Sequence, residues 1–240
     1  MTARAAISCN WKATAAPQGA APALGVAAAG VPWVLTLALF ASIGVPVSFG
    51  AATLVPVLVT GLRLMPWIAV RIARLDGAAP ADAVPSRTAS ARTLLGALTA
   101  GTAVALAGAC VVLALQTSWW ARALAVAGSL AALLHGRRRR FAVEVVPLVL
   151  VPLATTAAFE LGLLTTPAGT LADWQRLTLV LGTSAALVAL GLAGRTLSLP
   201  AGLRRQLDRL EGLAATSTGP LALGLLGLYD AAQQFAARFG

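Results

Sequence analysis

Between Arg92 and Arg122 the chain reads TLLGALTAGTAVALAGACVVLALQTSWWA (Thr93–Ala121), which is 29 residues without a charge. A helix needs about 20 mostly apolar residues to cross the hydrocarbon core of a bilayer. This stretch is long enough for one crossing near 94–115, followed by a short turn. The tryptophan pair at its end is typical of the zone where a membrane meets water. The stretch therefore predicts a transmembrane helix.

The composition of the whole chain supports the same fold class. Apolar residues make up 58% of the sequence and charged residues 11%, and the mean hydropathy is +0.83. An average soluble domain is about 45–50% apolar and about 25% charged. The chain has too little polar surface to cover a water-soluble globule, which excludes a cytosolic enzyme. We expect an all-α, polytopic bundle of transmembrane helices.

Uncharged stretches between charged residues predict seven spans. They lie near 22–42, 44–62, 94–115, 119–136, 142–164, 174–194 and 212–234. We expect residues 1–20 to form a disordered N-terminal tail, because they contain no apolar run of the kind that a signal peptide needs. Residues 21–240 then form one transmembrane domain.

The basic residues indicate how the helices are oriented. Lys and Arg number 18 and Asp and Glu number 8, a net charge of +10. Fifteen basic residues fall on one side of the predicted spans and three on the other. Cytoplasmic loops of membrane proteins are rich in Lys and Arg. The N-terminus is therefore predicted to be cytoplasmic and the C-terminus outside, in the cell membrane. Basic residues placed between apolar runs do not favour nucleic-acid binding.

A long cytoplasmic loop is expected at 63–93. Within 63–75, aliphatic side chains recur on one helical face, and the arginines that lie on the opposite face are Arg63, Arg71 and Arg74. Such an amphipathic helix is typical of the membrane interface. The part from Ala78 to Ser90 contains two prolines and is predicted to be an extended link. The sequence leaves open whether this loop only rests on the membrane or docks a partner subunit.

A run of four arginines closes the predicted hairpin between the fourth and fifth spans: Arg137, Arg138, Arg139 and Arg140. Basic residues next to a span attract anionic lipid, and a specific protein contact is the alternative. His135 adjoins the run and is expected to be interfacial. Glu144 is expected to pair with Arg140 one turn away, whereas Glu160 lies near the outer end of its span. A transport or proton-relay role for the two glutamates stays an alternative.

Catalytic motifs are absent from the sequence. It contains no Walker A loop, HExxH, CxxC or GxSxG pattern. One histidine and two cysteines do not make a usual metal site. We therefore predict no catalytic residues, no cofactor and no metal, and we expect that the protein is not an enzyme.

The order of these features resembles the EccD family, the multi-span membrane subunit of the actinobacterial type VII (ESX) secretion system. The resemblance covers about 50–238. It rests on LVPVLVTGLRLMPWIAVRIARLDG (Leu54–Gly77), on the basic turn HGRRRRF (His135–Phe141), on RRQLDRLEGLA (Arg204–Ala214) and on GPLALGLLGLYDAAQQF (Gly219–Phe235). EccD proteins have further spans and an N-terminal ubiquitin-like domain, so the resemblance is to the C-terminal part of the family.

The resemblance implies a non-catalytic scaffold or channel subunit of a type VII protein secretion complex. It implies EccB, EccC and EccE as partners, together with a second copy of the chain. It also makes the segment before the last span a candidate contact for partners or anionic lipid, through Arg204, Arg205 and Arg209. A small-molecule transporter or permease is the alternative. Transporters place polar groups and broken helices near the middle of the membrane, whereas the mid-span residues here are almost all Ala, Leu, Val, Gly and Thr.

Overall fold

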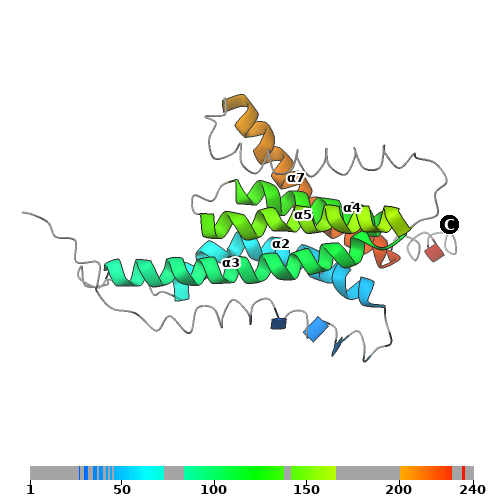
Figure 1. Cartoon of the computed structure of the whole chain (residues 1–240), viewed down its shortest axis with the longest axis horizontal. Coiled ribbons are helices and arrows are strands. Elements are labelled where there is room, and N and C mark those ends of the chain that lie inside the picture. Colours follow the sequence, from blue (N-terminus) through cyan, green and yellow to red (C-terminus); the bar gives the residue numbers. More distant parts are fainter. Residues whose placement is uncertain are drawn as a thin grey trace, which may run out of the picture.

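The computed structural model describes residues 46–72, 84–137, 142–165 and 201–228, with isolated positions between 27 and 44 and residues 234–235. The four ranges fold into a bundle of helices, and these described residues contain no strand (Figure 1). The helices are α2 (Val47–Ile72), α3 (Val84–Ala114), α4 (Trp119–Gly136), α5 (Ala142–Thr165) and α7 (Ala201–Leu225). The predicted all-helical class is confirmed for this part of the chain.

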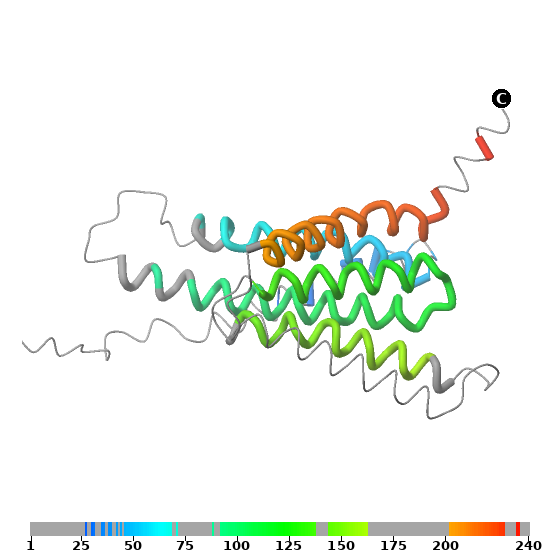
Figure 2. Tube along the Cα trace, turned by 90° about the horizontal axis from the view of Figure 1, so that it is seen from above, coloured from blue at the N-terminus to red at the C-terminus, as the bar shows by residue number. Residues whose placement is uncertain are grey.

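Helix α4 lies at the centre of the bundle. It packs against α2, α3, α5 and α7. Seen from above, α2 and α7 lie on one side of the bundle and α5 on the opposite side (Figure 2). The core is built mainly of alanine, leucine and valine side chains, among which Val55, Leu106, Leu124 and Leu148 are fully buried.

Gly128 allows the central helix to approach its neighbours closely. A Cβ atom placed there would lie 2.8 Å from Cγ1 of Val55 on α2 and 3.2 Å from Sγ of Cys110 on α3. Small residues in membrane helices allow backbones to pack at short range. A second close approach occurs at Gly224, where a Cβ would lie 2.7 Å from the Trp120 ring. These two glycines join α4 to α2, α3 and α7.

Three of the described helices are long and apolar enough to cross a membrane. The crossing segments are Val47–Ile68, Arg92–Ala114 and Glu144–Gly162. They belong to the second, third and fifth of the seven predicted spans. The fourth and seventh predicted spans correspond to α4 and α7, which fall short of this apolarity over the described residues. The sixth predicted span lies outside the described residues, as does most of the first. The tail predicted at 1–20 also lies outside them.

The structure differs from the predicted loop 63–93 at both of its ends. Residues 63–72 are helical, as predicted, but helix α2 continues into them without a break to Ile72, so they extend a span helix and Pro66 lies within it. Helix α3 begins at Val84, inside the segment that we expected to be an extended link. Pro85 stands in the first turn of α3, where proline is tolerated because the backbone N–H groups have no intrahelical partner. Charged residues end an apolar run, but they do not end a helix.

The last helix also begins earlier than its predicted span. Helix α7 starts at Ala201 and includes the whole RRQLDRLEGLA segment, which we had expected to be a connection before a span at 212. Arginine, glutamine, leucine and glutamate are all good helix formers. The first turns of α7 incline away from the long axis of the other helices (Figure 1).

The ends of five helices meet at one end of the bundle, which we call the basic end. Helices α2 and α4 finish there, and α3, α5 and α7 begin there (Figure 2). The described arginines in these segments are Arg63, Arg71, Arg87, Arg92, Arg137, Arg204, Arg205 and Arg209. Arg122 lies in the first turn of α4, at the opposite end, where its Nε donates to the carbonyl of Gln116.

Candidate functional site

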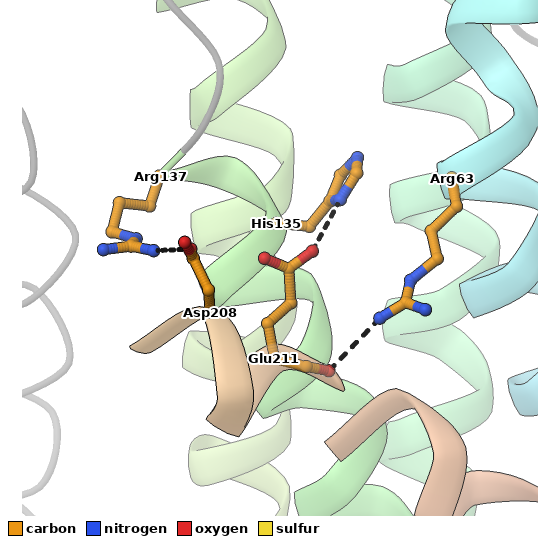
Figure 3. Close-up of polar contacts among 5 residues, drawn as sticks. All are labelled: Arg63, His135, Arg137, Asp208 and Glu211. Atoms are coloured by element: carbon orange, nitrogen blue, oxygen red, sulfur yellow. Dashed lines mark hydrogen bonds and ion pairs between the residues drawn. The ribbon is translucent and has the colours of Figure 1, made fainter. Parts of the chain in front are cut away.

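A group of charged side chains joins α2, α4 and α7 at the basic end (Figure 3). We call it the polar cluster; its members are Arg63, His135, Arg137, Asp208 and Glu211. Its centre is Glu211, whose side chain is only 4% exposed. Nδ1 of His135, on the last turn of α4, lies 3.3 Å from Oε1 of Glu211. The glutamate carboxylate therefore accepts a charge-assisted contact from α4 in a setting with little access to water.

Arg63 adds the contact with α2. Its Nη2 donates to the backbone carbonyl of Glu211 at 3.3 Å. The same residue of α7 is thus held through its side chain by α4 and through its backbone by α2. Val59, Leu62, Ala131 and Ala215 line the small space around these groups, so the contacts lie against apolar side chains.

A second ion pair lies one turn earlier on α7. Nη2 of Arg137 donates to Oδ1 of Asp208 at 2.5 Å. The arginine side chain is 13% exposed and the aspartate side chain 44%. Asp208 and Glu211 are three residues apart, so both face α4 from the same side of α7. The two acidic residues together fasten the start of α7 to the end of α4.

The predicted contact residues fall into three groups. Arg63 and Arg137 belong to the polar cluster and are bonded to α7. Arg71 is exposed, and its guanidinium carbon lies 4.5 Å from the centre of the Trp67 ring. The exposed arginines on the first half of α7 are Arg204, Arg205 and Arg209. The remaining candidates lie outside the described residues: Arg74, Arg138, Arg139 and Arg140.

The two glutamates of the fifth predicted span occupy different places in α5. Glu144 is buried in the first turn of the helix, where a negative charge interacts favourably with the helix dipole. Its expected partner Arg140 lies outside the described residues. Glu160 is half-buried near the other end of α5. His135 lies at the end of α4, as expected from its neighbouring arginines, but it contacts Glu211.

Sequence reasoning did not single out Asp208 and Glu211. Their signal is present in RRQLDRLEG, where two acids three residues apart interrupt a basic segment. Together with the only histidine of the chain, next to another basic run, this pattern could have suggested complementary helix ends. The pairing itself joins residues 76 positions apart, and no local pattern specifies it.

An apolar groove of about 740 Å³ runs along α4 between α5 and α7. Apolar side chains dominate its lining, among them Val126, Leu130, Phe159 and Leu213. The hydroxyls of Thr216 and Ser217 also line it, but each donates to a carbonyl of α7 itself. Small-molecule sites combine an apolar lining with a few convergent polar groups. The groove therefore suits an apolar chain better than a polar substrate.

The described residues offer no metal site. Among them, no three His, Cys, Asp or Glu side chains come together in a way that could hold a metal ion. Cys110, on α3, is buried in the core where α3 packs against α4. The chemistry of the polar cluster is thus salt bridging and hydrogen bonding between helices.

Comparison with known proteins finds a matching family and a solved structure with a similar fold. The EccD-like transmembrane domain family matches residues 2–235. Among solved structures, the chain is similar to protomer 1 of the ESX-3 core complex, with a TM-score of 0.68 and 20% sequence identity. The likeness covers 87% of this chain and 51% of that one, so the chain spans about half the length of the protomer. At this identity the likeness shows the fold. No curated protein matches the chain in sequence.

The fold and the cluster define a membrane protein built of tightly packed helices that are held together by charged groups at one end. The chain belongs to the EccD family, through its EccD-like transmembrane domain. The family match begins at residue 2, well before the start of the resemblance that the motifs carry, and it includes the segment expected to be a tail.

Proposed function

We propose that this chain is a non-catalytic scaffold or channel subunit of a type VII protein secretion complex in the cell membrane. The observation that carries the proposal is the EccD family match over nearly the whole chain. The similarity of the helix bundle to a protomer of the ESX-3 core complex supports it. On this proposal the energy for export comes from a partner ATPase.

The polar cluster fits a structural role. Its carboxylates contact basic groups at the end of α4, and Glu211 is almost fully buried. A group that holds two helices together in this way stabilises one arrangement of the bundle. The exposed arginines of α7 present positive charge at the basic end, where partners can make contact. We propose EccB, EccC, EccE and a second copy of the chain as those partners, and anionic lipid as a further contact.

A small-molecule transporter has less support. Transporters bind substrate where helices break near the middle of the membrane. Here Pro56, Pro147 and Pro152 lie inside the continuous helices α2 and α5. The groove beside α4 is apolar, and its hydroxyls are bonded within α7.

Deleting the gene tests the proposed function in the host cell. We expect the deletion strain to lose export of the substrates of one type VII system, because a scaffold subunit holds the export machinery together. Export is measured by mass spectrometry of the culture filtrate, with total cell protein as the reference. A plasmid copy of the wild-type chain should restore export. An unchanged set of exported proteins would contradict the proposal.

The proposed orientation puts the N-terminus and the basic end in the cytoplasm. Cys9 and Cys110 are the two cysteines of the chain, and Cys110 is buried. A membrane-impermeant maleimide should therefore label Cys9 only after the cells are permeabilised. In a Cys9→Ser background, Thr117→Cys provides the control, because Thr117 is exposed between α3 and α4 at the opposite end. If Cys9 were labelled in intact cells and the Thr117→Cys variant were not, the N-terminus and the basic end would lie outside the cell, and the proposed orientation would be wrong.

A further inference from the structure

The first half of α7 carries an exposed row of leucines. Leu203, Leu207 and Leu210 recur at spacings of four and three residues, so they share one face of the helix. Leu203 is 41% exposed and Leu210 48% exposed, while Leu207 is half-buried. We call this row the leucine stripe. Exposed leucines in line on an otherwise polar helix indicate a surface that meets an apolar environment.

Most of the exposed charges around the stripe are positive, and the exposed acid, Asp208, is paired with Arg137. Arg204, Arg205 and Arg209 are exposed. The acidic residues Asp208 and Glu211 instead face α4, where Arg137 and His135 hold them. At 100° per residue, Arg205 lies on the face of the helix almost opposite Leu203. Arg209 lies on the flank of the helix between Arg205 and Leu203, and Asp208 lies on the other flank. The outer surface of this half-helix thus combines an apolar stripe with a basic face.

Neighbouring residues show at what depth this half-helix lies. Trp67 on α2 is 58% exposed and stacks with Arg71, and tryptophan and arginine at the end of an apolar helix are typical of the membrane–water interface. Arg63, one turn of α2 further into the bundle, donates to the carbonyl of Glu211. One turn corresponds to about 5–6 Å. Glu211 therefore lies just inside the level of Trp67, and the preceding turns of α7 lie at interfacial depth.

The direction of the helix agrees with that depth. The first turns of α7 incline away from the axes of the helices that cross the bundle (Figure 1). A helix that continued straight along those axes would carry its leucines into water. A helix that inclines to the side at interfacial depth can place them against the lipid surface.

We propose that the first half of α7, from Ala201 to Leu210, is an amphipathic anchor that lies on the inner surface of the membrane. The leucine stripe faces the acyl chains, and Arg204 and Arg209, which flank the stripe on its two sides, bind anionic lipid headgroups, while Arg205 faces water. Interfacial helices have this combination of an apolar face and a basic face, and a basic surface complements the negative charge of the inner leaflet. The proposal rests on the proposed orientation, with the basic end in the cytoplasm. The polar cluster then holds the anchor at a fixed position relative to α2 and α4.

A depth measurement on the purified full-length chain tests this anchor. The Cys9→Ser variant with Leu203→Cys carries an environment-sensitive fluorophore at residue 203 and is placed in nanodiscs of phosphatidylcholine with phosphatidylglycerol. We expect blue-shifted emission and several-fold stronger quenching by doxyl-labelled lipid than for the same label on Arg205→Cys, on the opposite face. Replacing Arg204 and Arg209 by glutamine, or using phosphatidylcholine alone, should weaken the quenching at residue 203.

The possible outcomes separate this proposal from the proposed function. Water-like emission at residue 203 in the anionic nanodiscs would overturn the anchor and leave the stripe for a protein partner. Equal quenching at residues 203 and 205 would also overturn it, because a helix lying on the surface presents only one face to lipid. Neither result depends on export, which the gene deletion measures separately.

Discussion

The Gly128→Leu variant should lose about 3 kcal/mol or more of folding free energy, since overpacking a close-packed core commonly costs about 1–3 kcal/mol even for a few added methylenes. A Cβ at this position already approaches Val55 to 2.8 Å and Cys110 to 3.2 Å. The leucine side chain has no space to enter, so α4 must move away from both α2 and α3. The thermal midpoint of the detergent-purified chain, followed by the monodisperse peak in size-exclusion chromatography, measures the loss.

Gly61→Leu is the matched control. Gly61 lies in the middle of α2, and a Cβ there meets nothing within 4 Å. The same substitution should leave the midpoint unchanged or raise it, because leucine is a better helix former than glycine. The milder Gly128→Ala variant should be partly rescued by Val55→Ala, which removes the closest atom. If Gly128→Leu were as stable as Gly61→Leu, the close packing of α4 would be refuted.

Glu211→Leu should release the start of α7 from the rest of the bundle. The substitution removes the carboxylate that His135 contacts. The His135 side chain is 13% exposed, and removing the partner of a largely buried polar group costs about 1–3 kcal/mol. Hydrogen–deuterium exchange at the amides of Ala201–Leu210 should accelerate, while exchange in α3 should remain slow. The thermal midpoint should fall together with the protection of α7.

Three variants isolate the cause of that loss. Glu211→Gln keeps an acceptor for His135 and should retain most of the stability. Adding His135→Leu to Glu211→Leu removes both polar partners, so the double variant should recover much of the loss. Asp208→Ala breaks a pair whose aspartate is 44% exposed, and it should cost less than about 1 kcal/mol. Unchanged exchange in the Glu211→Leu variant would show that the polar cluster does not hold α7.

Charge boundaries predicted the positions of α4 and α5 well. Helix α4 occupies Trp119–Gly136, the range expected of the fourth span, and α5 occupies Ala142–Thr165, within one residue of the fifth. Both are apolar runs flanked by polar residues, and in both the end of the apolar run coincides with the end of the helix. Of these two helices, only α5 is apolar enough by composition to cross a membrane.

The same reasoning fails where a helix continues into polar sequence. Helix α2 continues past Arg63 to Ile72, α3 begins ahead of Arg92, and α7 begins at Ala201. Arginine and glutamate lower the hydropathy of a segment without lowering its helix propensity. Hydropathy therefore locates the apolar segments that can lie in the lipid. It underestimates how far the helices extend beyond those segments.

Only part of the polar cluster could be predicted from the sequence. The arginines that mark the basic end could be chosen by type and position. Arg63 and Arg137 were predicted to contact a partner or lipid, which stays a prediction, and their bonds to α7 within the chain were not foreseen. Their partners were not found, because Glu211 meets His135 and Arg63 only when α7 packs against α4 and α2. The role of Gly128 was hidden for a similar reason. In so alanine- and glycine-rich a chain, small-residue spacing does not show which glycine two neighbouring helices will enclose.

Purification of the tagged chain from its own host in mild detergent, followed by mass spectrometry of the co-purifying proteins, tests the proposed role most directly. A scaffold subunit of a type VII complex should be recovered in one large assembly that contains the partner ATPase EccC with EccB and EccE. The Gly61→Leu chain should bring down the same set, and the Gly128→Leu chain should lose it. A small oligomer of the wild-type chain, free of these proteins, would contradict a scaffold in a secretion complex.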